Sequence, residues 1–168
     1  MQIEYRLGRI EDLDEICSLV NGAVNKMIEN NILQWDEIYP TEVDFREDIN
    51  RKELYVGIVD GHIAVTYTIN QESDDEYKNG EWKYEDIPYY VVHRICVHPD
   101  FQNQGIGRHT LLYIEKQLLF IGIQAIRLDA FSENPYSLRM YDRLGYSKVG
   151  IAHFRKGRFY LLEKYLGN

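Results

Sequence analysis

The sequence predicts a mixed α/β fold, in which a sheet carries helices on both of its faces. Three observations predict it. Strand-like and helix-like patterns of apolar residues alternate along the chain. An Asp60-Gly61 pair separates two β-branched runs, which indicates a β-hairpin. A later apolar run breaks into a glycine-containing loop and then into a helical pattern. We expect one domain over residues 1–168, because a chain of 168 residues can bury a core of its own.

In the first half of the chain, the spacing of apolar residues indicates a strand, two helices and the hairpin. Residues 2–6 form the first predicted strand, and a polar helix is predicted over residues 42–51. The two strands of the hairpin cover residues 54–59 and 62–69. Apolar residues at helical spacing indicate the first helix: Leu13, Ile16, Cys17, Val20, Val24 and Met27.

The second half begins with a segment of different composition. Residues 71–85 are polar and acidic, so we interpret them as a solvent loop that Pro88 closes. The elements that follow are a central strand over 89–97, a helix over 106–119, a fifth strand over 125–131, a short helix over 135–144, and a hairpin of 147–154 and 158–165 around Gly157.

The loop before the third helix, residues 102–108 and here called the glycine loop, has the composition of a phosphate-binding loop. Gly105 and Gly107 lack side chains that would keep a ligand from the backbone, and Arg108 adds a positive charge. It is not a P-loop, and Thr110 stands where a Rossmann fingerprint needs its third glycine. The alternative is a tight turn that needs positive φ angles.

Two motifs together carry a family resemblance. Gln102-Asn103-Gln104-Gly105-Ile106-Gly107 follows the pattern Gln-x-x-Gly-x-Gly, and a later block runs from Asn134-Pro135 to Gly145-Tyr146. In both, the chain resembles the Gcn5-related N-acetyltransferase (GNAT) superfamily, whose coenzyme A signature is Arg/Gln-x-x-Gly-x-Gly/Ala. The resemblance extends over nearly the whole chain and implies the GNAT fold, a mostly antiparallel sheet of about seven strands.

The resemblance implies that acetyl-CoA is a co-substrate. No metal is expected, because the two cysteines of the chain form no Cys-x-x-Cys pair. The pantetheine arm would pair with the backbone of the central strand, and the pyrophosphate would bind the glycine loop. For Asn134, a contact with the pantetheine arm and a helix cap are both open. The residues expected to bind acetyl-CoA are Ile95, Cys96, Val97, Gln102, Asn103, Gln104, Gly105, Ile106, Gly107, Arg108, Asn134 and Tyr141.

The same resemblance implies catalytic roles. The Ile95 amide would stabilise the oxyanion of the tetrahedral intermediate, and Tyr141 would protonate the leaving thiolate. Some relatives carry a glutamate as general base, but residues 89–92 hold no carboxylate. His93, two residues before Ile95, could relay a proton through water, or it could be a satisfied polar group of the strand. His98 precedes a proline and is expected to brace the turn.

The acceptor site is expected in the first helices and the loops beside them. Trp35 and Tyr39 could form the walls of an amine pocket, or a hydrophobic lid without substrate contact. The acidic residues within 72–76 could attract a cationic amine, or they could simply be solvated.

Composition sets limits on localisation and partners. The formal net charge of −8 disfavours nucleic acid and anionic membranes. Cys17 and Cys96 are far apart in apolar patterns, as expected for buried free thiols in a reducing compartment. Without a signal-peptide pattern or a membrane-spanning run, the protein is expected to be soluble and cytoplasmic.

The function that these observations predict is transfer of an acetyl group from acetyl-CoA to a primary amine, directly in a ternary complex. A small-molecule acceptor is favoured over a protein N-terminus or lysine. A non-catalytic coenzyme A-binding or sensor domain is the alternative of a different class. The prediction leaves room for a homodimer.

Overall fold

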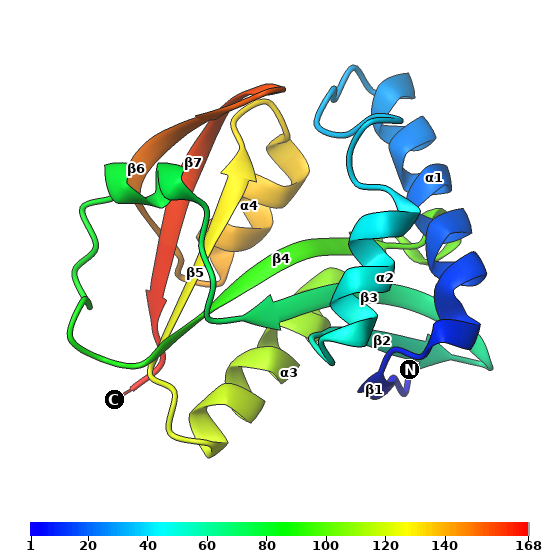
Figure 1. Cartoon of the computed structure of the whole chain (residues 1–168), viewed down its shortest axis with the longest axis horizontal. Helices are drawn as coiled ribbons and strands as arrows, with labels where there is room; N and C mark the ends of the chain where they lie inside the picture. The colour runs from blue at the N-terminus through cyan, green and yellow to red at the C-terminus, as the bar shows by residue number, and fades with distance from the viewer. Residues whose placement is uncertain (168) are drawn as a thin grey trace. The chain divides into compact units, whose positions relative to one another are not determined.

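The computed structural model describes residues 1–167. The strands are β1 (Glu4–Leu7), β2 (Leu54–Val59), β3 (His62–Asn70), β4 (Tyr89–Val97), β5 (Ala125–Phe131), β6 (Ser147–Phe154) and β7 (Gly157–Tyr165). The helices are α1 (Leu13–Glu29), α2 (Glu42–Asn50), α3 (Ile106–Phe120) and α4 (Pro135–Arg143), with short 3-10 helices η1 (Ile10–Asp12), η2 (Asp75–Asn79) and η3 (Pro99–Phe101) (Figure 1).

The strands form a seven-stranded sheet in the order β1-β2-β3-β4-β5-β7-β6. The pairs β1–β2, β2–β3, β5–β7 and β6–β7 are antiparallel, and β4–β5 is parallel. The predicted fold class is therefore confirmed. The largest difference in a strand's start is at β1, which begins at Glu4 rather than at residue 2.

Two compact units make up the chain. The first unit contains Met1–Ile69 and His93–Thr110, and the second contains Asn70–Val92 and the chain from Leu111 onward. β4 and α3 each contribute residues to both units. The glycine loop lies in the first unit, whereas α4 lies in the second.

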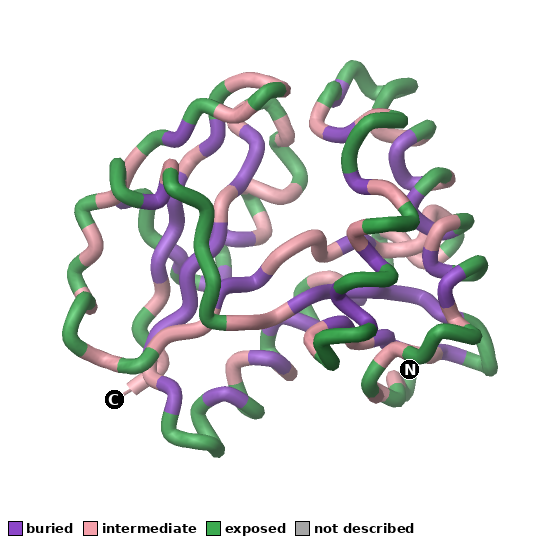
Figure 2. The backbone as a smooth tube through the Cα atoms, in the orientation of Figure 1, coloured by how far each residue is buried: buried purple, intermediate pink, exposed green. Residues whose placement is uncertain are grey.

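In the first unit, helices cover both faces of the β2–β3 hairpin. α1 and α2 pack on the face that carries Leu54, Val56 and Ile63 (Figure 1). On the opposite face, Val59 and Val65 pack against the first residue of α3, Ile106. Both strands are buried along most of their length, as expected for strands that are covered on both faces. Figure 2 shows long stretches of both strands in purple, the colour of buried residues.

The hairpin turn has the conformation that its sequence predicts. Asp60 and Gly61 have φ angles of 49° and 80°, so both residues are left-handed. A two-residue turn with two left-handed residues matches the twist of the strands that it joins. Val59 and His62 are therefore paired directly across the turn.

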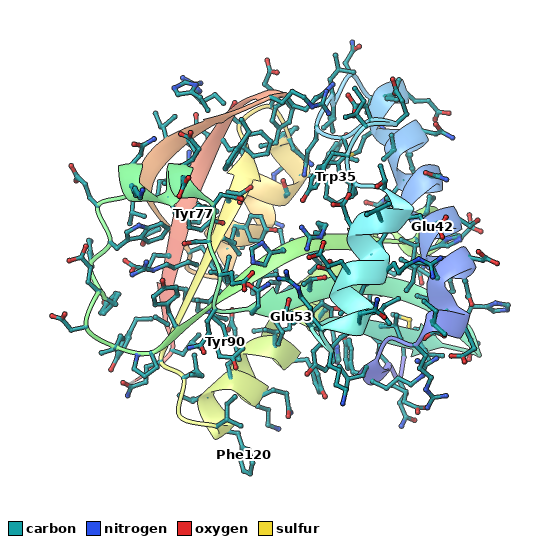
Figure 3. The ribbon with its side chains drawn as sticks, viewed as in Figure 1. Trp35, Glu42, Glu53, Tyr77, Tyr90 and Phe120 are labelled. Atoms are coloured by element: carbon teal, nitrogen blue, oxygen red, sulfur yellow. The ribbon has the colours of Figure 1, made fainter. Side chains whose placement is uncertain are left out.

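The segment between β3 and β4 corrects the prediction of a simple solvent loop over residues 71–85. Tyr77 of η2 is only 3% exposed (Figure 3), and its hydroxyl donates a hydrogen bond of 2.7 Å to Asp129 Oδ2 on β5. Trp82 stacks on Tyr77, and its indole nitrogen donates to the Tyr77 carbonyl at 2.8 Å. Two aromatic residues thus fix a segment whose remaining residues are largely polar.

The C-terminal end of α3 has an apolar surface. Phe120 is 89% exposed and extends from the helix into solvent (Figure 3), and Ile121 follows it on the surface. Within residues 1–167, no helix is both long enough and apolar enough to cross a membrane.

Candidate active site

The glycine loop presents backbone amides at the start of α3. Asn103 and Gly105 are left-handed, with φ angles of 61° and 79°. The His109 amide donates to the Gly105 carbonyl at 2.9 Å, which is the first hydrogen bond of the helix. The amides of residues 106–108 belong to the first turn and have no acceptor within the helix. The positive end of the helix dipole lies at the same point, so an anion is favoured there.

Polar side chains hold this loop in shape. Gln102 Nε2 donates to the Val97 carbonyl at 3.1 Å, and Gln104 Nε2 donates to the Asp100 carbonyl at 3.0 Å. His98 Nδ1 accepts a hydrogen bond of 3.0 Å from the Asp100 amide, which confirms its expected bracing role. The two glutamines therefore act locally as supports of the loop backbone.

The start of α3 is tied into the first unit by a buried hydroxyl. Thr110 Oγ1 donates to the Ile106 carbonyl at 2.8 Å, and the Tyr5 hydroxyl on β1 lies 2.9 Å from the same Oγ1. The Ile106 side chain is buried. A glycine at residue 110 would lack the hydroxyl that makes both contacts. Arg108 is exposed beside the first-turn amides.

β4 carries the residues expected to contact the pantetheine arm and the thioester. Ile95 and Val97 are half-buried and pack against the cluster around Ile106, whereas Cys96 belongs to the cluster under α1 and α2. Burial raises the pKa of the Cys96 thiol to about 12, so the thiol stays protonated at neutral pH. Both cysteines are free thiols, as expected, with Cys96 buried and Cys17 half-buried.

The regular alternation of side chains between the two faces of the strand is interrupted within β4. Arg94, between His93 and Ile95, is left-handed with a φ of 49°. In a regular strand, residues two apart such as His93 and Ile95 share a face, but the left-handed residue between them interrupts that regularity. His93 is half-buried, and its role as a base remains a prediction.

The Arg94 side chain forms a polar cluster that the sequence analysis missed. Its Nε donates to Asp48 Oδ2 at 2.9 Å, and its Nη2 lies 2.8 Å from Oδ1 and 2.6 Å from Oδ2. Nη1 donates to the Tyr39 hydroxyl at 2.9 Å, and Thr68 Oγ1 donates to Asp48 Oδ2 at 2.9 Å. Burial alone would lower the pKa of Arg94, but Tyr39 and Asp48 outweigh it and the pKa is raised.

The two predicted acceptor residues lie in different environments. Trp35 (Figure 3) is buried in the hydrophobic cluster formed with α1 and α2, which favours a packing role. Tyr39 is 38% exposed, and its hydroxyl accepts the hydrogen bond from Arg94. Of the two residues, Tyr39 is the one whose ring remains partly accessible to a ligand.

The second unit contains the remaining predicted residues, Asn134 and Tyr141. Asn134 Oδ1 accepts a hydrogen bond of 3.2 Å from the Ser137 amide, so the capping role is observed. Tyr141 is 6% exposed, and its ring meets Tyr146 edge-on at 5.6 Å. Burial, and secondly the charge of Asp129, raise the pKa of Tyr141, so its hydroxyl is protonated at neutral pH.

The acidic segment before β4 is solvated. Asp75 is 97% exposed, and the Lys78 Nζ lies 3.7 Å from its Oδ1. Exposed pairs of this kind contribute about 0–1 kcal/mol. Residues 72–75 are exposed, whereas Tyr77, two residues further along, is buried.

The chain is similar in sequence and in fold to known N-acetyltransferases. The S-(2-succino)cysteine N-acetyltransferase of Bacillus subtilis is 27% identical over 168 residues, covering 98% of this chain and 96% of that protein. The S-alkylcysteine N-acetyltransferase of the same organism is 27% identical over 147 residues, covering 84% of this chain and 77% of that protein. A GNAT acetyltransferase structure from Streptococcus agalactiae has the same fold, with a TM-score of 0.86, 22% identity, and coverage of 99% of this chain and 96% of that chain.

The family model decides the classification. It matches residues 24–146, which include β4, the glycine loop and the whole of α4. The matched segment thus holds both motifs that the sequence analysis singled out. On this evidence the chain belongs to the acetyltransferase (GNAT) family of N-acetyltransferases.

Proposed function

We propose that this protein transfers the acetyl group of acetyl-CoA to the primary amine of a small molecule, directly and in a ternary complex. The observation that carries the proposal is the glycine loop, where left-handed Asn103 and Gly105 lead into the first-turn amides of α3. Family membership supplies the reaction class. The whole chain would serve as one catalytic domain.

On the donor side, the amides of residues 106–108 and the Arg108 guanidinium would bind the pyrophosphate of coenzyme A. The loop is held by its own glutamines, so little ordering would be needed when the ligand binds. The backbone of Ile95 and Val97 would pair with the pantetheine arm, in keeping with the family resemblance.

The proposed chemistry uses two groups of the chain, the Ile95 amide and the Tyr141 hydroxyl, and a third, His93, is a candidate. The Ile95 amide would stabilise the negative charge that develops on the thioester oxygen when the amine nitrogen bonds to the carbonyl carbon. As the carbon–sulfur bond breaks, the Tyr141 hydroxyl would give its proton to the leaving thiolate. The proton that the attacking amine loses would pass to water, with His93 as the candidate relay. The acid role requires a protonated hydroxyl, which a tyrosine holds at neutral pH, and burial raises the pKa of Tyr141 above its usual value.

The relatives suggest the class of acceptor. Two of them are named for N-acetylation of cysteine derivatives substituted on sulfur, and the first spans nearly the full length of this chain. The shared chemistry is an α-amino group on a small amino acid with a thioether side chain. We therefore propose an S-substituted cysteine, or an amino acid of similar size, as the acceptor.

A thiol-release assay tests the proposal. Purified protein and acetyl-CoA are incubated with S-alkylcysteines, S-(2-succino)cysteine, unsubstituted amino acids, polyamines and peptides, and coenzyme A formation is followed against an amine-free control. Release with S-substituted cysteines above the other amines is the expected result. Release with peptides alone would favour a protein acetyltransferase. Tight binding of acetyl-CoA without release for any amine would favour a sensor.

A further inference from the structure

A largely buried ion pair connects α2 to the strand that carries the proposed oxyanion donor, and its Arg94 and Asp48 side chains are 16% and 9% exposed. Asp48 of α2 is 6% exposed as a whole residue and accepts hydrogen bonds from Arg94 of β4 and from Thr68 of β3. Arg94 also donates to Tyr39, which lies in the segment between α1 and α2. All four residues lie in the first unit.

The backbone of Arg94 is unusual for a strand. Its φ of 49° is left-handed, a conformation that residues with a Cβ atom disfavour. The backbone angles of residue 94 help to set the orientation of the peptide that follows, and that peptide contains the Ile95 amide. A strand that relaxed to the ordinary extended conformation at this residue would turn the Ile95 N–H in another direction.

We infer that the Asp48–Arg94 ion pair holds β4 in this left-handed conformation and thereby aims the Ile95 amide. Arg94 is thus a positioning residue, and its catalytic part rests on the proposed function. The bidentate contact fixes the guanidinium in two directions, as a single lysine contact would not. Thr68 in turn orients the Asp48 carboxylate from the neighbouring strand.

The contacts of the guanidinium favour positioning over recognition of the acceptor. Each of its three nitrogens donates to a residue of the first unit: Nε and Nη2 to Asp48, and Nη1 to Tyr39. The cation is thus already neutralised by a buried carboxylate. The pair would also transmit a displacement of Tyr39 to β4, because Arg94 belongs to β4 and donates a hydrogen bond to Tyr39.

A pair of double variants separates the effect of the backbone conformation at residue 94 from the effect of its side chain. Arg94→Gly and Arg94→Ala are each combined with Asp48→Asn, so that no buried carboxylate is left without its cation. Glycine adopts left-handed angles freely, whereas alanine does not. Arg6→Ala is the control, because Arg6 forms another bidentate pair in the same unit, with Asp12 at 2.7 and 2.9 Å.

The first measurement needs no turnover. In ¹H–¹⁵N spectra, the Ile95 amide resonance should move in the alanine double variant and return towards its wild-type position in the glycine double variant. The Arg6→Ala control should leave it in place. An Ile95 resonance that is equally displaced in the glycine and alanine double variants, or unmoved in both, would overturn the inference.

The second measurement is turnover. The alanine double variant should lose about 10²-fold in kcat, with KM for acetyl-CoA and for the acceptor changed by less than about threefold. The glycine double variant should keep most of the wild-type kcat. Equal losses in both, with a raised acceptor KM, would mean that the guanidinium binds substrate, against the inference. A wild type inactive on every amine would contradict the proposed function, and the amide resonance would still decide on the ion pair.

Discussion

Gly105 offers a direct test of anion binding by the glycine loop. Its φ of 79° is left-handed, and a Cβ atom placed on it would meet nothing within 4 Å. Asn and Asp tolerate left-handed angles better than other residues with side chains. Gly105→Asn and Gly105→Asp therefore add side chains of the same shape at little steric cost, and they differ by one negative charge.

The expected difference in coenzyme A affinity between the two variants follows from the exposure of residue 105 and from the added charge. Gly105 is exposed, so a high dielectric applies, and a charge about 5 Å from a pyrophosphate with two negative charges is repelled by about 1–2 kcal/mol. Coenzyme A should consequently bind the Asp variant about 5–30-fold more weakly than the Asn variant. The difference should shrink as salt is added, because the Debye length is about 8 Å at physiological ionic strength.

Gly122 provides the matched control. It follows α3 with a φ of 86°, and a Cβ atom there would also meet nothing within 4 Å. Titration calorimetry with coenzyme A, at low and high salt, measures all four variants. The Asn and Asp variants at residue 122 should bind alike. Equal affinities for the two variants at residue 105 would refute the assignment of the loop.

Three further predictions concern single side chains. Tyr141→Phe should lower kcat by about 10²-fold or more while the Kd for acetyl-CoA stays near wild type, and unchanged kcat would exclude the acid role. Burial raises the pKa of both thiols, and that of Cys96 more than that of Cys17. Iodoacetamide near neutral pH should therefore modify Cys17 slowly and Cys96 only after unfolding. Equal modification rates of the two cysteines, measured by mass spectrometry, would contradict this prediction. Asn134→Ala should reduce the free energy of unfolding by about 1 kcal/mol through loss of the Ser137 cap, and Asn134→Asp should not. A large rise in the Kd for coenzyme A in the Asp variant would instead indicate a ligand contact.

Features that depend on local chemistry could be predicted from the sequence. The Asp60-Gly61 turn and the left-handed Gly105 follow from the few residues that such backbone angles allow. Asn134 and Pro135 likewise mark the start of α4. In each case the deciding interactions lie within a few residues of the chain.

Features that depend on distant contacts were missed. Asp48 lies one residue before Ile49 and three after Phe45 on a helix with a polar sequence, and in the structure it is buried with them. A signal was present, since an acidic residue three positions from a buried aromatic lies on the same helix face. Arg94 lies within an apolar strand, and a charged side chain in such a strand needs a buried residue of opposite charge as its partner. The burial of Tyr77 was missed because residues 71–85 are mostly polar, and the hydrogen bond of Tyr77 is to Asp129, which is distant in the sequence.

The two units interleave along the chain in a way that affects how the protein can be divided. The chain passes from one unit to the other within β3, within β4 and within α3, and at none of these points through a linker. Domain boundaries ordinarily fall in exposed, flexible segments that tolerate cutting or lengthening. Here every boundary interrupts a ladder or helix of backbone hydrogen bonds, and any single cut leaves at least one unit without part of its sequence. Neither unit can therefore be expressed as one contiguous piece or exchanged as a module, and an insertion at these boundaries would break regular structure in both.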